Sequence, residues 1–158
     1  MTHRYRSLIQ TIGHTRWFAR LGRAVVPLDQ FIQSRSKGRL TILGTQVLPQ
    51  LLLTTTGRLS GQSRTVGLLY AQQDGGYVVV ASNWGQARHP AWSVNLLAEP
   101  RASVEIRGRS IPVVAELLDG AERERVWATV TEVWPAYDTY ADRSGRTLRV
   151  FLLRDTRG

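Results

Sequence analysis

The middle and C-terminal parts of the chain consist of short segments rich in apolar and β-branched residues, each bounded by turn residues. Three such segments, at 51–56, 66–72 and 76–82, follow one another closely and are predicted to be strands. The tripeptide 74–76, Asp-Gly-Gly, is a strong hairpin signal between the second and third. Strands connected in this way pair in an antiparallel sheet.

Further strands are predicted at 102–107 and 111–118, joined by the turn residues 108–110, and the apolar stretch 148–153 predicts a final strand. Five or six short strands, mostly linked as hairpins, thus occur together with helices at both ends and one helix between strands. This order of elements predicts an α+β, mainly β fold, in which helices cover a small β-barrel. Internal repeats and linker-like segments do not occur, so the pattern indicates one unit.

A helix is predicted between two prolines in the centre of the chain. Pro90 lies in its first turn and Pro100 ends it. The spacing of the apolar residues predicts that Trp92, Leu96 and Leu97 face inward.

A second helix is predicted after the strand 111–118. Asp119 is its expected N-cap, and Glu122 three residues later makes a variant of the capping box. Pro135 ends the helix. The apolar stripe of this helix contains Val126, Trp127, Val130, Val133 and Trp134.

The N-terminal part of the chain alternates arginines with apolar residues between residues 4 and 26. Trp17, Leu21 and Val25 have an i, i+4 spacing, which predicts a helix with one apolar and one basic face. Such a helix either packs on the protein's own core, covers a ligand cleft, or lies on anionic lipid. Packing on the core or covering a ligand cleft is preferred over contact with lipid.

The charge balance limits the classes of partner. Lys and Arg total 21 against 12 Asp and Glu, which gives a net charge of +9 and favours anionic partners. Nucleic acid is not expected as a partner, because no recognised basic and aromatic motif accompanies the charge. The absence of cysteine excludes disulfides and thiolate chemistry, and the three histidines are too far apart to predict a metal site.

The chain contains neither a signal-peptide core nor a run of the roughly 20 apolar residues that span a bilayer. We therefore expect a cytoplasmic protein. Contact of residues 4–26 with the inner face of the cell membrane is left open by the basic amphipathic pattern.

The segment 57–64, Gly-Arg-Leu-Ser-Gly-Gln-Ser-Arg, is the strongest candidate for a binding site. Its glycines allow backbone N–H groups to turn inward, and concave rows of N–H groups bind oxyanions. Arg58 and Arg64 flank the turn, and each carries a planar guanidinium that suits a phosphate. A plain hairpin loop remains the alternative interpretation of the same residues.

Two further places contain candidate functional groups. The polar segment 81–86, Ala-Ser-Asn-Trp-Gly-Gln, follows a strand and can offer backbone and amide groups to a heterocycle, or it is only a connection. Tyr137 and Tyr140 are three residues apart, so both hydroxyls face one way on a helical turn. Paired phenols orient a substrate or donate a proton, although such tyrosines are more often packing residues. Sites of this kind bind a cofactor that supplies the chemistry.

Several segments resemble a known family when taken in order along the chain. These are 51–64 with its Thr-Thr-Gly-Arg-x-Ser-Gly-x-x-Arg motif, the 74–76 hairpin, 81–85, 89–96 with His-Pro-Ala-Trp, and 135–140 with Pro-Ala-Tyr-Asp-Thr-Tyr. Together they resemble the deazaflavin (coenzyme F420)-dependent nitroreductase family of actinobacteria. The resemblance covers about residues 45–154, and its combination of motifs is specific.

The resemblance implies a split β-barrel of the FMN-binding, pyridoxamine-phosphate-oxidase-like type. It divides the chain into an N-terminal helical segment, 1–44, and a deazaflavin-binding domain, 45–158. It also implies a homodimer and coenzyme F420, rather than FMN, as the hydride carrier.

The resemblance also implies roles for individual residues. Tyr137 and Tyr140 would line the substrate pocket and act in catalysis by orienting the substrate or supplying a proton, and Trp17 would be a lid residue. The implied cofactor-binding residues are Gly57, Arg58, Ser60, Gly61, Gln62, Arg64, Ala81, Ser82, Asn83 and Trp92.

This chain departs from the family pattern at three places. Leu59 stands where many members have lysine, Asn83 and Trp84 replace a familiar Lys-Gly pair, and Arg143 replaces an aromatic residue. Weaker cofactor binding is therefore expected. The expected activity is transfer of a hydride from F420H2 to a small-molecule acceptor, preferably a quinone or enone, with nitroaromatics less favoured. A non-catalytic F420- or lipid-binding split barrel is the alternative.

Overall fold

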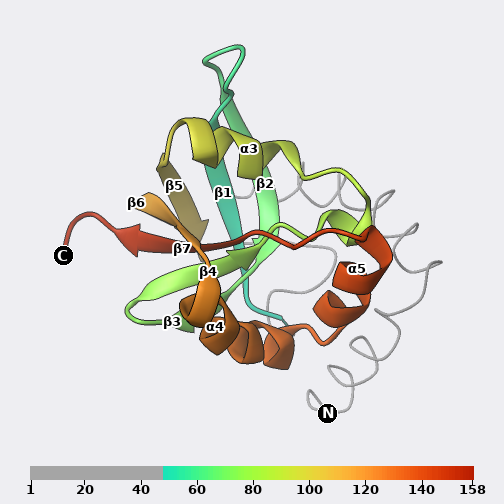
Figure 1. Cartoon of the computed structure of the whole chain (residues 1–158). Helices are drawn as coiled ribbons and strands as arrows, with labels where there is room; N and C mark the ends of the chain where they lie inside the picture. The colour runs from blue at the N-terminus through green and yellow to red at the C-terminus, as the bar shows by residue number, and fades with distance from the viewer. Residues whose placement is uncertain (1–47) are drawn as a thin grey trace.

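The computed structural model describes residues 48–158, which form one curled sheet and its covering helices (Figure 1). The seven strands run in the order β2-β1-β5-β6-β7-β4-β3, and every neighbouring pair is antiparallel. The strands are β1 (Gln50–Thr56), β2 (Ser63–Leu69), β3 (Ala71–Gln73), β4 (Gly76–Val80), β5 (Arg101–Ile106), β6 (Arg109–Leu118) and β7 (Val150–Asp155). The helices are the short 3₁₀ helix η1 (Asn83–Gly85), α3 (Ala91–Ala98), α4 (Gly120–Val133) and α5 (Ala136–Ser144).

A single residue, Tyr70, connects the two edges of the sheet. Strand β2 is one edge and β3 is the other, yet Leu69 ends the first and Ala71 begins the second. One residue of extended chain spans only about 3.3–3.6 Å, so the end of β2 and the start of β3 lie close together. The sheet therefore curls into a half-barrel, and the strand predicted at 66–72 is in fact divided between its two edges.

Strand β4 and residues 150–153 of β7 are buried on both faces, which explains their apolar sequences. In β4, Val78 and Val80 pack in one hydrophobic cluster while Val79 packs in the other. In β7, Leu152 and Phe151 are divided between the same two clusters. The alternation follows from the opposite directions of successive side chains in a strand.

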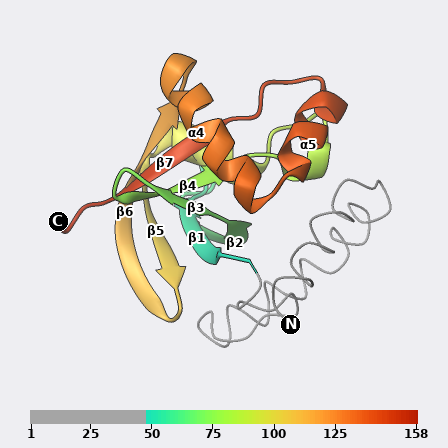
Figure 2. The same ribbon diagram turned by 90° about the horizontal axis from the view of Figure 1, so that it is seen from below.

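The helices cover different faces of the sheet. Figure 2 shows α4 and α5 side by side, where Val126 and Val130 of α4 pack in one cluster with Val78 and Val80 of β4. Helix α3 packs against β1 and contributes to the second cluster. The two helices between the prolines and after residue 118 are thus confirmed, with α4 ending before Pro135.

Two details of the predicted helices are wrong. Leu97 is 47% exposed, because it lies on the outer side of α3, whereas Trp92 and Leu96 face inward as expected. Asp119 is the N-cap residue of α4 as expected, but its side chain makes no capping hydrogen bond; its carbonyl oxygen accepts the first helical bond, from the Arg123 N–H at 3.1 Å.

The predictions for residues 4–26, for Trp17 and for the boundary at residue 44 concern residues outside the described part of the chain. They stay predictions.

Candidate functional site

The turn between β1 and β2 has a closed backbone and exposed side chains. The Gly57 N–H donates to the Gln62 carbonyl at 2.7 Å, and the Gly61 N–H donates to the Gly57 carbonyl at 2.7 Å. Gly61 has a φ of +67°, a conformation that favours glycine. A Cβ at Gly57 would lie 3.1 Å from the Gln62 carbonyl oxygen and 2.6 Å from the Ser60 Oγ, which can rotate away, so space there is tight.

Asn95 fixes this turn to helix α3. Its Oδ1 accepts from the Arg58 N–H at 3.1 Å, and its Nδ2 donates to the Thr55 Oγ1 at 3.1 Å. Asn95 and Thr55 are both buried. Asn95 is not among the site residues predicted from the sequence. A signal existed, because Asn95 is a polar residue beside Leu96 on the inward side of an apolar helix.

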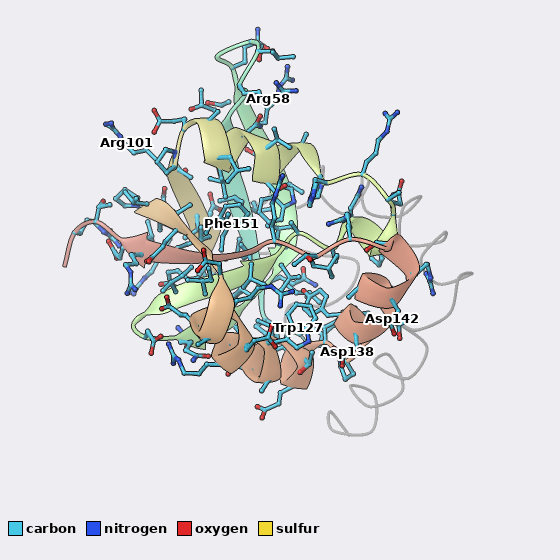
Figure 3. All side chains as sticks on the ribbon, viewed as in Figure 1. Arg58, Arg101, Trp127, Asp138, Asp142 and Phe151 are labelled. Carbon is cyan, nitrogen blue, oxygen red and sulfur yellow. The ribbon has the colours of Figure 1, made fainter. Side chains whose placement is uncertain are left out.

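The arginines of the turn carry exposed positive charge. Within residues 48–158, neither Arg58 nor Arg64 pairs with a carboxylate, although Arg64 donates to the Gln62 Oε1 at 3.4 Å. Figure 3 shows Arg58 at the outer end of the β1–β2 hairpin. Several arginines elsewhere have carboxylate partners, namely Arg101, Arg123, Arg125, Arg154 and Arg157. The turn therefore presents guanidinium groups that an anion can still engage.

The loop after β4 has an unusual backbone. Asn83, Trp84 and Gly85 have φ values of +46°, +56° and +74°, so three successive residues are left-handed. For residues other than glycine, such conformations cost about 1–3 kcal/mol each and persist only where the surroundings enforce them. The Asn83 Nδ2 donates to the Arg88 carbonyl at 2.8 Å, and the Arg146 guanidinium donates to the Ala81 and Ser82 carbonyls.

Trp92 lies inside the curled sheet. Its side chain is 7% exposed, and its ring centroid is 5.8 Å from that of Phe151 in β7. It occupies the first turn of α3, so it lies between the loop after β4 and the turn that Asn95 holds.

Tyr137 and Tyr140 are both buried in the cluster between α4, α5 and the sheet. The Tyr140 ring lies 6.4 Å from Trp84 in the loop, whereas the Tyr137 ring lies 6.4 Å from Trp127 in α4. Burial raises the pKa of both phenols above the usual value, so each stays protonated at neutral pH. In this state a tyrosine can donate a hydrogen bond but is a poor base.

Most of the expected site residues thus lie on elements that contact or directly follow one another. The turn 57–62 is bonded to α3, the N-terminal end of α3 adjoins the loop 81–89, and η1 in that loop contacts α5. Tyr140 is the tyrosine beside the loop. Tyr137 lies farther into the helical layer, against α4.

The model of one protein family, described as F420H(2)-dependent quinone reductase, matches residues 28–155. The chain belongs to this family. The chain is 32% identical over 143 residues to the F420H(2)-dependent quinone reductase Rv1261c of Mycobacterium tuberculosis, covering 88% of this chain and 96% of that protein. The family resemblance inferred from the motifs is thereby confirmed.

Solved structures confirm the fold of this F420H(2)-dependent quinone reductase family member. A structure titled F420-H2 dependent reductase (FDR-A) has a TM-score of 0.62 at 37% identity, covering 67% of this chain and 94% of that chain. A second, titled as a domain-swapped dimer, has a TM-score of 0.63 at 35% identity, covering 81% and 99%. The expected split β-barrel of the pyridoxamine-phosphate-oxidase-like type is therefore correct. None of the helices in residues 48–158 has the length and apolarity to cross a membrane.

Proposed function

We propose that the protein is an oxidoreductase that uses F420H2 to reduce a quinone or enone, with nitroaromatics as less favoured acceptors. The observation that carries the proposal is the family match, which extends over residues 28–155. When bound, the reduced deazaflavin supplies a hydride to the acceptor. The tasks of the chain are to bind, to orient and to exclude water.

The residues of the turn fit the anionic part of this cofactor. F420 carries a phosphodiester and an oligoglutamate tail, and Arg58 and Arg64 are exposed guanidinium groups without carboxylate partners in the described part of the chain. We assign these arginines to the cofactor together with the turn residues Gly57, Ser60, Gly61 and Gln62. Screening at physiological salt leaves direct contacts, rather than long-range attraction, as the main source of affinity.

We assign the loop residues Ala81, Ser82 and Asn83 to the deazaflavin ring, with Trp92 nearby. The left-handed backbone at Asn83 supports this assignment, because strained conformations concentrate at functional sites. A nearby phenol then orients the acceptor or supplies a proton. Tyr140 is the better placed of the two tyrosines, since its ring adjoins Trp84 of the loop.

The preference for quinones and enones rests on the matched family, which is described as F420H(2)-dependent quinone reductase, and the departures from the family pattern lower the expectation for nitroaromatics. Leu59 is 86% exposed and brings no charge to the turn, and the bulky Trp84 ring occupies the loop. Arg143 lies 5.7 Å from the centre of the Tyr140 ring, so a cation stands where an aromatic residue is familiar. These differences argue against assuming nitroimidazole reduction.

We further propose a homodimer in the cytoplasm. The domain-swapped dimer formed by the homologue supports the oligomeric state. Trp17 as a lid residue and membrane contact through residues 4–26 stay proposals about residues outside the described part of the chain.

Titration with F420 and, separately, with FMN tests the cofactor. Oxidation of F420H2 by menadione under anaerobic conditions then tests the activity. F420 binding with acceptor-dependent oxidation is the expected result, and binding of FMN but not F420 would overturn the proposal. Tight F420 binding without oxidation by any quinone or enone would instead identify a non-catalytic cofactor carrier. Turnover of Tyr140→Phe equal to that of the wild type would remove the assigned role of that hydroxyl.

A further inference from the structure

The most concentrated polar contact in the described part of the chain is made by Arg146, which precedes β7. Its Nε donates to the Gln86 carbonyl at 3.1 Å, and its Nη1 and Nη2 both donate to the Ala81 carbonyl at 3.1 Å. Nη2 also donates to the Ser82 carbonyl at 3.0 Å, and Nη1 contacts the His89 Nδ1 at 3.1 Å. One guanidinium thus bonds both ends of the loop 81–89.

His89 must accept a hydrogen bond in this contact. An arginine guanidinium carries only donors, so the Nδ1 of His89 is unprotonated and the ring is neutral. Burial, followed by the charges of Arg149 and Arg146, holds the pKa of His89 below its usual value, which agrees with this state. The loop therefore gives Arg146 only neutral acceptors.

Besides this contact, the strained loop is held by the packing of η1 on α5, by the Asn83 side chain and by a few backbone hydrogen bonds. Its left-handed residues Asn83 and Trp84 are followed by hydrogen bonds from the Gly85 N–H to the Ser82 carbonyl at 2.9 Å and from the Gln86 N–H to the Asn83 carbonyl at 3.1 Å. These are short turns within the loop. The Ala81 N–H donates to the Arg149 carbonyl at 2.8 Å and ties the start of the loop to the chain before β7, and the guanidinium adds links at Ser82, Gln86 and His89. Charge-assisted hydrogen bonds are about twice as strong as neutral ones.

The same contacts determine where the loop's free N–H group points. In a trans peptide the C=O and the following N–H point in opposite directions, so binding of the Ser82 carbonyl by Arg146 turns the Asn83 N–H away from the guanidinium. Within residues 48–158 the Asn83 N–H has no hydrogen-bond acceptor. A cation on the carbonyl polarises the peptide and strengthens this donor.

We infer that Arg146 is a positioning residue: by binding the carbonyls of the loop 81–89 it holds the loop in place and directs the Asn83 N–H toward the bound ring. This inference rests on the proposed function, because that function assigns Ala81–Asn83 to the deazaflavin. Arg146 does not itself touch the cofactor in this scheme. It acts through the carbonyls that it holds.

The test compares Arg146→Lys and Arg146→Gln with the control Arg154→Lys. Arg154 is an exposed arginine that pairs with Glu116 at 3.1 Å and contacts no part of the loop. Lysine keeps the charge but loses the planar fork, and glutamine loses both. Lysine also serves as the milder variant if the glutamine variant fails to fold.

The first measurement is hydrogen exchange of the backbone amides without any cofactor. Both Arg146 variants should accelerate exchange in residues 82–89 by about tenfold or more, because several charge-assisted hydrogen bonds are lost, while β1 and β6 stay protected. The control should match the wild type. Unchanged exchange in the loop of a folded Arg146→Gln protein would overturn the inference.

The second measurement is the dissociation constant of oxidised F420, with KM and kcat for F420H2. The Arg146 variants should weaken binding about tenfold at an unchanged fold, whereas a merely structural role would lower the melting temperature and leave the affinity of the folded protein intact. Faster loop exchange with wild-type F420 affinity would also overturn the positioning role. If the wild type binds no F420, the proposed function and the ring-aiming step fail together, while exchange still decides whether Arg146 fixes the loop.

Discussion

The replacement Asn95→Ala offers the sharpest test of how the glycine turn is held. The Asn95 side chain is 6% exposed and makes two hydrogen bonds, one to the Arg58 N–H and one to the Thr55 Oγ1. Alanine removes both hydrogen bonds at once. The side chain that replaces it is small, so no new contact takes their place.

The expected loss of stability follows from the burial of the two groups left behind. An unpaired buried polar group costs about 1–3 kcal/mol, and Thr55, at 2% exposure, should lie in the middle of that range. The Arg58 N–H is nearer to solvent and can rebind water, so it should contribute about 1 kcal/mol. Alanine returns about 0.5 kcal/mol through its higher helix propensity. The net loss is therefore about 2.5 kcal/mol of unfolding free energy.

Urea unfolding followed by tryptophan fluorescence measures this loss. Asn95→Asp is the matched variant, since it keeps an acceptor for the Arg58 N–H and loses only the donor to Thr55. A double-mutant cycle with Thr55→Val should give a coupling of about 1 kcal/mol between the two side chains. Amide exchange at Arg58 should rise in Asn95→Ala and not in Asn95→Asp. An unfolding free energy within about 0.5 kcal/mol of the wild type would refute the reasoning.

Three further predictions concern single positions. Leu59→Lys should tighten F420 binding about two- to fivefold at low salt, less at high salt, and leave stability unchanged because Leu59 is 86% exposed; fluorescence titration at two salt concentrations measures it, and equal affinity would contradict it. Gly76→Ala should cost about 1–3 kcal/mol in urea unfolding, because its Cβ would lie 2.7 Å from the Leu153 carbonyl oxygen, which is backbone and cannot move freely. The pKa of His89 is held below 6.5 by burial and by Arg149 and Arg146, so the unfolded chain binds a proton more readily; stability should fall as pH drops below about 6.5. His89→Gln, which stays neutral, should lose that part of the pH dependence in melting temperatures measured from pH 5 to 8.

The strands were predictable because their chemistry is local. The sequences of β4 and of residues 150–153 in β7 are apolar runs, and burial on both faces requires such runs. The division at Tyr70 could not be predicted. Residues 66–72 read as one strand, and only their partners, Gln50 for Leu69 and Val78 for Ala71, place the two halves on opposite edges.

The site was predictable in its residue types but not in its supports. Glycines and arginines at 57–64 mark the turn from sequence alone. Asn95 bonds to residues 37 and 40 positions away, and Arg146 bonds to residues 57 to 65 positions away. An arginine-rich chain gives no local sign of which guanidinium is directed inward. The exposed Leu97, by contrast, shows that helical spacing alone overestimates the width of the buried face.

The two supports act on different loops that helix α3 separates in the chain: Asn95 lies in α3, and His89, which Arg146 contacts, lies two residues before it. Asn95, in the second half of α3, holds the turn, while Ser93, nearer its start, accepts from Arg149 at 3.4 Å and donates to the Pro90 carbonyl at 2.9 Å beside the loop. Trp92 fixes the helix to Phe151 of β7. A change that shifts α3 on the sheet therefore alters both loops together, whereas loss of Asn95 or Arg146 alters one. In the proposed function, loss of Asn95 should therefore affect binding of the anionic tail, and loss of Arg146 should affect the position of the ring.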